Sequence, residues 1–464
     1  MSEHLHWDPL LIQRYNRPGP RYTSYPTAVE FLPVESDQPE QDAYTQRDPN
    51  RPLSLYLHIP FCRHVCYYCG CNKIVTRDMD RALPYLDLLK QEIKAKHAML
   101  KTADDGQLAP VEQLHLGGGT PTFLTDDQLR DLMDYLKALF RFSESDTADF
   151  SIEIDPRELR PGTLTLLREM GFNRVSYGVQ DLNPKVQEAV NRVQPESMVR
   201  DVMSQARALG FRSINIDLIY GLPHQTLESF DATLSAIIEL RPDRLSIFNY
   251  AHLPERFKPQ RRINGDDLPP ADEKLAILGR CITRLSEAGY HYVGMDHFAL
   301  PEDELAVAQS RGELHRNFQG YTTHGNCDLL GFGISSISQI GDYYLQNRVT
   351  EATYAEALNA DSLPTWKQRQ VTTDDLIRRR VITELLCHLT LSYDQLDQEF
   401  TIESREYLAD SLERLHPMRD DGLVDLTSNA IRITDKGRLL VRNACMAFDT
   451  YLQHHEQQRF SKAI

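Results

Sequence analysis

Residues 56–71 read YLHIPFCRHVCYYCGC, and this short stretch holds four of the chain's eight cysteines. Cys62, Cys66 and Cys69 have the spacing C-x3-C-x2-C. They follow an apolar run, 53–59, that is typical of a β-strand, so the thiols are expected on the loop that leaves this strand. Three thiolates on one short loop can bind three corners of a four-iron four-sulfur cube, and the fourth iron then has an open position for a small molecule.

Two other kinds of cysteine site remain open at this point, a zinc site and a disulfide framework. Zinc knuckles usually combine two paired half-sites, and no later pair of cysteines or histidines follows this loop, although His64 lies within it. We find no signal peptide ahead of the loop, which disfavours disulfides. The remaining cysteines stand singly and are expected to be small buried residues: Cys281, Cys327, Cys387 and Cys445.

Length, composition and charge restrict the class of protein. A chain of 464 residues is too long for one ordinary core, so we expect a large domain with one or two smaller units. The contents of 41% hydrophobic and 25% charged residues are ordinary for a globular protein, and no apolar run is long enough for a membrane span, so we expect a cytoplasmic protein. The formal net charge of -16 argues against nucleic-acid binding, but a local arginine cluster could still bind an anionic substrate.

The first fifty residues are predicted to form an N-terminal arm, 1–50. A short helix is expected over 8–15, and the following stretch, 17–27, contains three prolines and a glycine that exclude a regular helix. Tyrosines and other large residues of this arm indicate that it packs onto another part of the chain. Arg17 and Arg21 of the arm are available to pair with carboxylates.

The segment 51–300 repeats one unit, a short β-rich run followed by a turn and an amphipathic helix. The predicted strands are 53–59, 112–116, 150–154, 173–178, 212–219 and 243–249. The predicted helices are 80–99, 125–140, 162–170, 195–209 and 226–240, and a helix at 271–288 with a strand at 290–295 could add a seventh unit. This alternation indicates parallel strands and favours an open, partial (β/α) barrel, with a doubly wound sheet as the alternative.

In either fold the functional site lies at the carboxyl ends of the parallel strands, and the unusual residues of this sequence cluster there. The cysteine loop follows the first strand. The later strand ends carry GGGTP at 117–121, EIDP at 153–156, GVQD at 178–181, DLIYGLP at 217–223 and NYAH at 249–252. Each group alone could be a tight turn or a helix cap, but six such groups on one edge indicate a site.

Individual residues at these strand ends suit a bound amino acid or nucleoside. The glycines 117–119 would let backbone amides approach a ligand closely. Glu153 or Asp217 could accept hydrogen bonds from hydroxyl or ammonium groups, and Gln180 offers both a donor and an acceptor. Arg192 could pair with a carboxylate.

The segment 301–364 is predicted to be a loop-rich connection. His297, His315 and Arg316, together with nearby aromatic residues, could form a lid over the mouth of the barrel. The equally acceptable alternative is that these side chains belong to the surface or the core.

The last segment, 365–464, is predicted to be a mostly helical, winged-helix-like domain. Helices are expected at 373–389, 392–399 and 404–414, followed by a β-hairpin within 421–434 and a last helix at 435–454. Winged helices often bind DNA, but the acidic chain favours a structural cover.

The cysteine spacing resembles that of the radical S-adenosylmethionine (SAM) superfamily, in which the open iron binds the amine and carboxylate of SAM. The chain is most similar, within that superfamily, to the oxygen-independent coproporphyrinogen III oxidases. The matching segments are 56–73, 117–121, 215–223 and 315–321. The resemblance covers nearly the whole chain. It implies an oxidoreductase that decarboxylates two propionate side chains of coproporphyrinogen III to vinyl groups, giving protoporphyrinogen IX in haem biosynthesis without oxygen.

The resemblance also implies roles for individual residues. Cys62, Cys66 and Cys69 would bind one four-iron four-sulfur cluster. Cys71 and Tyr56 would be required for catalysis, Cys71 in a role that its chemistry alone does not define. The cluster-bound SAM would contact Tyr56, Gly118, Glu153 and Ile337. A second SAM would contact Tyr68, Gly119, Thr120, Gln180, Arg192, Asp217 and Ala251; Tyr68 stands where a phenylalanine is common, so its hydroxyl needs a partner.

The implied chemistry is radical chemistry. Reductive cleavage of SAM gives methionine and a 5'-deoxyadenosyl radical, which abstracts a hydrogen from the propionate β-carbon; loss of carbon dioxide and one electron then leaves the vinyl group. An electron donor to the cluster and a terminal electron acceptor are implied, and a monomer is expected. We expect Arg17, Arg21 or Arg316 to pair with carboxylates of the substrate.

Two other functions are weighed against this one. A haem-binding chaperone relative would share the cluster motif without oxidase activity, but such relatives typically lack the cysteine at position 71 and the long arm, both of which this chain has. A zinc-dependent winged-helix regulator would bind zinc and show salt-dependent DNA binding.

Overall fold

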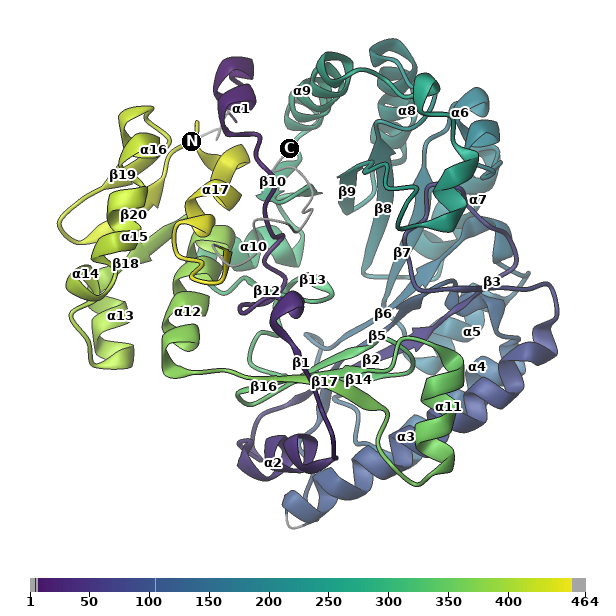
Figure 1. Ribbon diagram of the computed structural model, residues 1–464. Helices are drawn as coiled ribbons and strands as arrows, with labels where there is room; N and C mark the ends of the chain where they lie inside the picture. The colour runs from purple at the N-terminus through teal and green to yellow at the C-terminus, as the bar shows by residue number, and fades with distance from the viewer. Residues whose placement is uncertain (1–4, 6, 105, 453–464) are drawn as a thin grey trace. The chain divides into compact units, whose positions relative to one another are not determined.

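The computed structural model describes residues 5, 7–104 and 106–452 (Figure 1). Within these residues the chain forms two compact units. The larger unit contains 31–270 and 326–370, and the smaller unit is assembled from the described parts of 1–30, 271–325 and 371–464. None of the helices in the described part of the chain combines the length and the apolar character needed to cross a membrane.

A sheet of parallel strands forms the centre of the larger unit. These strands lie side by side in the order β14 (Asp328–Phe332), β2 (Leu53–Ile59), β5 (Val111–Gly118), β6 (Asp149–Ile154), β7 (Arg174–Gln180), β8 (Ser213–Tyr220) and β9 (Arg244–Asn249). Beyond β14 the sheet continues with antiparallel strands β15 (Ile337–Ile340), β16 (Tyr343–Asn347), β17 (Thr365–Gln370) and β1 (Leu32–Pro33). The partial (β/α) barrel predicted from the sequence is thus confirmed.

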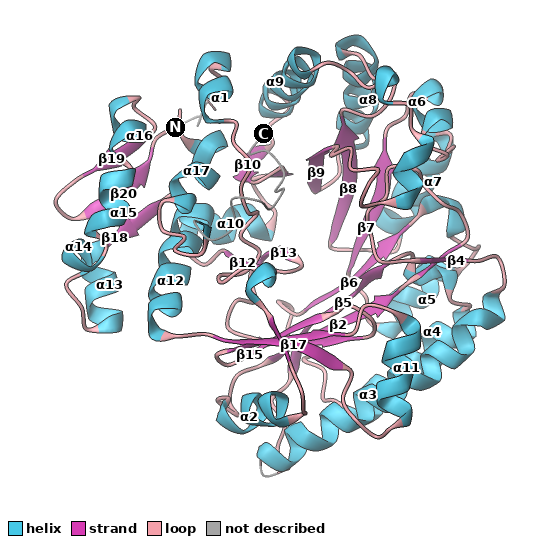
Figure 2. Cartoon of the chain, in the orientation of Figure 1, coloured by secondary structure: helices cyan, strands magenta, loops and turns pink. Residues whose placement is uncertain are grey.

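Helices join successive parallel strands and lie along the outer side of this sheet (Figure 2). They are α3 (Ala82–Ala103), α4 (Asp126–Leu139), α5 (Thr163–Met170), the short α6 (Pro184–Ala189), α7 (Glu196–Ala208) and α8 (Leu227–Leu240). Helix α4 begins with a capping box, in which Thr125 and Gln128 satisfy each other's backbone amides. All six predicted strands and the five predicted helices of this segment are present, with ends that differ by a few residues.

The segment 301–364 is not the loop-rich connection that the sequence predicts. Its first part contains α10 (Glu304–Arg311) and the hairpin β12 (His315–Asn317) and β13 (Gly320–Thr322) in the smaller unit, whereas its second part contributes β14, β15, β16 and α11 (Glu351–Asn359) to the larger one. All five residues of β14 are buried against β2. The strands of this segment are only three to five residues long, and β14 pairs with β2 far away in the sequence, so no local pattern reveals them.

The C-terminal part of the smaller unit has the predicted winged-helix-like order. It contains α12 (Thr373–His388), β18 (Thr390–Ser392), α13 (Tyr393–Phe400), α14 (Ser404–Tyr407), α15 (Ala409–Arg414), α16 (His416–Asp420), β19 (Val424–Leu426), β20 (Ala430–Ile433) and α17 (Val441–Met446). The three strands form one antiparallel sheet. The last helix is much shorter than the predicted 435–454, and the end of that prediction lies outside the described residues.

The predicted seventh unit does not extend the parallel series. Helix α9 (Ala271–Glu287) and strand β10 (His291–Gly294) are present, but β10 pairs antiparallel with β11 (His297–Ala299) and both belong to the smaller unit. Tyr292 and Phe298 face each other in this pair with ring centroids 5.1 Å apart. The turn between the strands is too short for the crossover helix that a parallel pair requires.

The N-terminal arm is ordered over its described residues but is not a single extended segment. It contains α1 (Pro9–Tyr15), the irregular proline-rich stretch and α2 (Gln38–Gln46), and α2 belongs to the larger unit. In the smaller unit the hydroxyl of Tyr22 donates to Asp449 at 3.0 Å, and the guanidinium of Arg442 donates to the carbonyl oxygen of Pro20 at 3.2 Å. The tyrosines of this stretch are therefore core residues, because their rings are buried and their hydroxyls are hydrogen-bonded.

A fully buried charge network ties α2, α3 and β16 together in the larger unit. The ammonium of Lys96 lies 2.8 Å from Glu92 and 3.4 Å from Glu40, and none of these three side chains is more than 1% exposed. Glu92 also accepts hydrogen bonds from the side chains of Asn347 at 2.6 Å and Tyr354 at 2.5 Å. Each carboxylate oxygen of Glu92 thus has partners, which offsets the large cost of taking these charges out of water.

We expect Lys96→Met to lower the free energy of unfolding by about 3–5 kcal/mol, because it leaves two carboxylates buried without their cation. Urea unfolding followed by circular dichroism measures the change. Lys90→Met on the same helix is the matched control, because Lys90 pairs with Asp131, whose side chain is 63% exposed, and should change stability little. Equal losses in the two variants would show that the buried network is not what stabilises this region.

Candidate functional site

A cavity of about 290 Å³ opens at the carboxyl ends of the parallel strands in the larger unit. The cysteine loop and the ends of β5, β6 and β7 form its walls, with Asp217 of β8 and Phe248 of β9. The predicted site residues that line it are Cys62, Cys66, Cys69, Cys71, Tyr68, Gly118, Gly119, Thr120, Glu153, Gln180, Arg192 and Asp217. Tyr56, Ala251 and Ile337 lie outside this lining.

The cysteine loop is held in place by a small parallel pair of strands, β3 (Phe61–Cys62) and β4 (Ile74–Val75). All four loop cysteines are free; Cys66 is buried, Cys62 and Cys69 are half-buried, and Cys71 is exposed. Burial raises the pKa of the Cys62 thiol to about 12. The thiol must therefore give up a tightly held proton when it binds a metal.

Cys69 has a different environment from Cys62, although both thiols line the same cavity. Cys71 hydrogen-bonds to its sulfur and lowers the pKa of the Cys69 thiol; burial opposes this shift, and the ammonium of Lys73 supports it. The Lys73 ammonium also donates to the carbonyl oxygen of Cys69 at 3.1 Å. The neighbouring Cys71 thus favours the thiolate form of Cys69.

Cys66 lies between two arginines that share one carboxylate. Nη2 of Arg157 and Nη1 of Arg192 each lie 3.4 Å from the sulfur of Cys66. The same two nitrogens lie 2.7 Å and 2.9 Å from the Asp155 carboxylate, respectively. Burial opposes ionisation of Asp155, but the two guanidiniums outweigh it and lower the pKa of this carboxyl to about 2. The Cys66 thiol therefore lies beside two guanidinium cations, both of which are held by the Asp155 carboxylate.

The three glycines 117–119 at the end of β5 are required by the close packing around them. A Cβ on Gly117 would lie 3.0 Å from the Glu153 carboxyl group, and a Cβ on Gly119 would lie 2.6 Å from the carbonyl oxygen of Phe61. Gly118 has φ of +115°, and a Cβ there would lie 2.8 Å from the ring of His58. The glycines allow the cysteine loop, the end of β5 and Glu153 to meet closely, in addition to leaving backbone amides accessible.

Glu153 is held at the cavity wall by hydrogen bonds from two sides. The amide of Gly118 donates to its carboxylate at 3.2 Å, and Nε2 of His115 lies 3.3 Å from the other oxygen. Burial opposes ionisation, yet these contacts lower the pKa of Glu153. The side chain is therefore a carboxylate acceptor at neutral pH.

Tyr56 reaches the cysteine loop through His58, which the sequence analysis did not single out. The hydroxyl of Tyr56 lies 3.1 Å from Nδ1 of His58, whose Nε2 lies 2.9 Å from the carbonyl oxygen of Asn72. The carbonyl must accept, so Nε2 carries the proton and Nδ1 accepts from the tyrosine. This chain of bonds joins strand β2 to the loop segment that follows Cys71. The position of His58 within the quoted motif was a signal for this role.

Gln180 stands out because its conformation is unusual and its side chain lacks a full set of partners. Its φ is 69°, which is uncommon for a residue other than glycine. The buried Oε1 atom of Gln180 has no hydrogen-bond partner among the residues that the structure describes. An orphaned acceptor beside a cavity indicates a ligand that donates to it.

Backbone contacts connect Ala251 and Ile337 to residues of the site. The side chain of Gln260 donates to the carbonyl oxygens of both Tyr68, at 2.9 Å, and Ala251, at 3.3 Å. Ile337 begins β15, next to Gly331 of β14, which in turn pairs with Tyr56 of β2. The sequence carried no signal for the bridging role of Gln260, because its loop lies far from Tyr68 along the chain.

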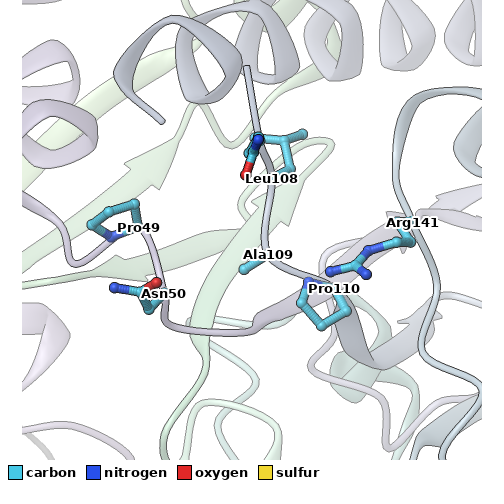
Figure 3. A pocket seen from close by; sticks show the side chains of 7 residues that line it. Pro49, Asn50, Leu108, Ala109, Pro110 and Arg141 are labelled. Carbon is cyan, nitrogen blue, oxygen red and sulfur yellow. The ribbon is translucent and has the colours of Figure 1, made fainter. Parts of the chain in front are cut away.

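A second hollow, of about 470 Å³, lies at the opposite, amino end of β2 and β5 (Figure 3). It is lined by Pro49, Asn50, Gln107, Leu108, Ala109, Pro110 and Arg141. It has a single charged side chain and no thiol. Parallel sheets place their sites at the carboxyl ends of the strands, so the smaller cavity is the candidate site.

The residues of this cavity fit an iron–sulfur cluster. Three thiols of one loop face a common cavity, and the cations of Arg157, Arg192 and Lys73 adjoin their sulfur atoms or loop, as suits a group of thiolates. Within the described ranges, no three side chains of His, Cys, Asp or Glu converge closely enough to hold a single metal ion. The Oε1 of Gln180 and the Nε of Arg192 are unpaired there and suit a polar ligand beside the cluster.

Comparisons with known proteins agree with this geometry. Residues 56–237 match the model of the radical SAM superfamily, and residues 371–440 match the HemN C-terminal domain. The chain is 52% identical to the oxygen-independent coproporphyrinogen III oxidase of Pseudomonas aeruginosa over 100% of both chains. It is 50% identical to that of Escherichia coli K12, over 100% of this chain and 99% of the relative.

A solved structure gives the same result for the fold. The structure of the coproporphyrinogen III oxidase HemN from Escherichia coli, described as a radical SAM enzyme, matches with a TM-score of 0.91 at 50% identity. The match covers 97% of this chain and 100% of that one.

Asp217 gives the site a testable pH dependence. Burial, with the nearby Glu153 carboxylate, raises the pKa of Asp217 from 3.8 to about 6. The folded chain holds this proton more tightly than the unfolded chain, so the wild type loses stability as the pH rises through this interval.

We expect Asp217→Asn to match the wild-type stability below about pH 4 and to exceed it above pH 6, by on the order of 2 kcal/mol. Melting temperatures of the metal-free chain, measured across this range, check the prediction. Curves that stay parallel at every pH would contradict it.

Proposed function

The chain belongs to the family of oxygen-independent coproporphyrinogen III oxidases, and from this premise we propose that it oxidatively decarboxylates two propionate side chains of coproporphyrinogen III. The products are the two vinyl groups of protoporphyrinogen IX, a step of porphyrin biosynthesis. The observation that carries the proposal is the cavity at the carboxyl ends of the strands, where Cys62, Cys66 and Cys69 meet on one loop. Identity of about half over the whole length of the relatives supports it.

We assign the three thiols to one four-iron four-sulfur cluster. Such a cluster with SAM supplies one-electron reductive cleavage of SAM and thereby the radical that abstracts hydrogen from the substrate. The contribution of the chain is to hold its ligands in place. The hydrogen bonds Tyr56–His58–Asn72 fix the loop on one side, and Asp155 holds two guanidiniums against Cys66 on the other.

We propose that two SAM molecules bind around this cluster. The residues for the first are Tyr56, Gly118, Glu153 and Ile337, and those for the second are Tyr68, Gly119, Thr120, Gln180, Arg192, Asp217 and Ala251. The carboxylate of Glu153 suits an ammonium or ribose hydroxyl, and the orphaned oxygen of Gln180 suits a donor. The positive charge of Arg192 acts on the Tyr68 hydroxyl, but burial dominates and raises its pKa, so Tyr68 stays a neutral donor.

The decisive experiment is an anaerobic assay of the reconstituted chain. SAM, a reductant, coproporphyrinogen III and a cell extract that supplies the electron acceptor should give protoporphyrinogen IX, with about two 5'-deoxyadenosines per product. SAM cleavage with the porphyrinogen untouched, together with tight haem binding, would instead favour a haem chaperone. A purified chain that takes up no iron would contradict both functions.

Substitution of the loop cysteines separates ligands from a non-ligand. Cys62→Ser, Cys66→Ser and Cys69→Ser are each expected to lower iron from about four atoms per chain to near zero, because a cube with two thiolates is poorly held. Cys71→Ser is the matched control on the same loop and should keep its iron while losing product formation. Iron loss in the control equal to that of the other three would contradict the assignment.

The substrate carboxylates have candidate partners in the smaller unit. Arg316 lies 4.8 Å above the ring of Tyr321, and two of its guanidinium nitrogens are buried without a hydrogen-bond partner in the described chain. Arg21 pairs with Asp296. Burial, and then the positive charge of Arg21, lower the pKa of the Arg442 guanidinium to about 10. The guanidiniums of Arg21, Arg316 and Arg442 thus lie near the Asp296 carboxylate and near one another, and such a concentration of positive charge suits an anion.

Arg17 is the weakest of the three arginines expected from the sequence. Its side chain is exposed, and it follows directly after α1 rather than within this cluster. We therefore propose Arg21 and Arg316 as the carboxylate partners, with Arg17 retained only as a residue to be tested.

We expect Arg316→Gln to raise KM for coproporphyrinogen III at least about tenfold, the loss of one charge-assisted hydrogen bond of about 1.5–3 kcal/mol. Arg21→Gln should act in the same direction. Arg14→Gln is the control, because Arg14 is 60% exposed and pairs with Asp421. Steady-state kinetics decides: an unchanged KM in Arg316→Gln, Arg21→Gln and Arg17→Gln would show that the carboxylates bind elsewhere.

A further inference from the structure

Arg157 contacts the cysteine loop but does not line the cavity. Its Nη2 atom lies 3.4 Å from the sulfur of Cys66. Arg192 makes the same contact, but Arg192 also forms part of the cavity wall, where a ligand would meet it. Arg157 thus contacts the proposed cluster ligand Cys66 and is not one of the residues assigned to SAM.

The position of the Arg157 guanidinium is set by Asp155. Its Nε donates to the carboxylate at 3.0 Å and 3.2 Å and its Nη2 at 2.7 Å, while the backbone amide of Arg157 donates to the same carboxylate at 3.0 Å. The side chains are 12% and 8% exposed, respectively. Because Nε and Nη2 of the planar guanidinium are both held by Asp155, the second N–H of Nη2 is directed toward the sulfur. The contact is therefore built into the turn after β6.

The positive charge beside Cys66 is larger than the charge that would neutralise the Asp155 carboxylate. Two buried guanidiniums, those of Arg157 and Arg192, face one carboxylate, so the group carries a net positive charge beside Cys66. A hydrogen bond or a cation next to a thiolate ligand stabilises the form of a cluster that carries more negative charge. Little solvent reaches the pair to weaken this effect.

Resting on the cluster assignment of the proposed function, we propose that Arg157 is a positioning residue that raises the reduction potential of the cluster through its N–H···S contact with Cys66. Reduction adds one electron, and hence one negative charge, to the cluster and its thiolates. Arg157 stabilises this reduced form more than the oxidised form. The residue thereby makes the first electron transfer from the external reductant more favourable without touching SAM or substrate.

The test compares cluster reduction in Arg157→Gln and Arg160→Gln with that in the reconstituted wild type. Arg160 is the matched control, because it lies three residues further on, pairs with Asp126 and donates to the carbonyl oxygens of Thr122 and Leu124 without contacting a cysteine. The electron paramagnetic resonance signal of the reduced cluster, followed against applied potential without SAM, gives the reduction potential of each protein.

We expect Arg157→Gln to decrease the equilibrium constant for reduction about tenfold, equivalent to about 59 mV toward more negative potential for one electron. Arg157→Lys keeps the charge but lacks the planar fork, so a smaller shift in the same direction is expected. Arg160→Gln should have the wild-type potential.

Three results would overturn parts of this inference in distinguishable ways. A wild-type potential in whichever Arg157 variant retains its iron would contradict the tuning role. Loss of the cluster from both Arg157 variants would assign Arg157 to holding the loop instead. Absence of any reducible cluster in the wild type would overturn the proposed function on which the inference rests.

Discussion

Parallel pairing of β2 with β5 and of β5 with β6 is the constraint on which the site depends. Parallel strands end at the same edge of a sheet, so His58 lies beside Gly117 and the end of β5 lies beside Glu153. The cysteine loop leaves β2 at that edge. At 117–119 the approach of neighbouring groups leaves no room for a side chain, and the glycines there follow from this crowding.

Positive charge is concentrated at two places in the chain, although the net charge of the whole chain is negative. The formal net charge is -16, yet two guanidiniums surround Cys66, and Arg21, Arg316 and Arg442 gather in the smaller unit. Buried cations are costly unless they have partners or a ligand. A thiolate beside Cys66's two arginines, and a substrate carboxylate beside the arginines of the smaller unit, suit these cations, because a bound anion offsets part of the free energy lost when the cations leave water.

Several of the elements and residues that sequence reasoning missed have a partner that is distant along the chain. Strand β14 is recognisable only by its pairing with β2, and the short strands after it look like loops until they join the sheet. Gln260 bridges Tyr68 and Ala251 through backbone carbonyls, a role that no side-chain pattern records. Arg157 contacts Cys66, which lies far away in the sequence, because Asp155 holds its guanidinium in that direction.

The sequence by itself determined the class of fold, the loop of three cysteines and the edge of the sheet at which the site lies. It could do so because strand and helix periodicity, thiol spacing and strand-end residues are local patterns. Only the tertiary structure decided which side chains act on one another: that Cys71 lowers the pKa of Cys69, that His58 joins Tyr56 to the loop, and that Arg21 of the arm pairs with Asp296. Those contacts depend on long-range packing, which brings together residues that no local pattern relates.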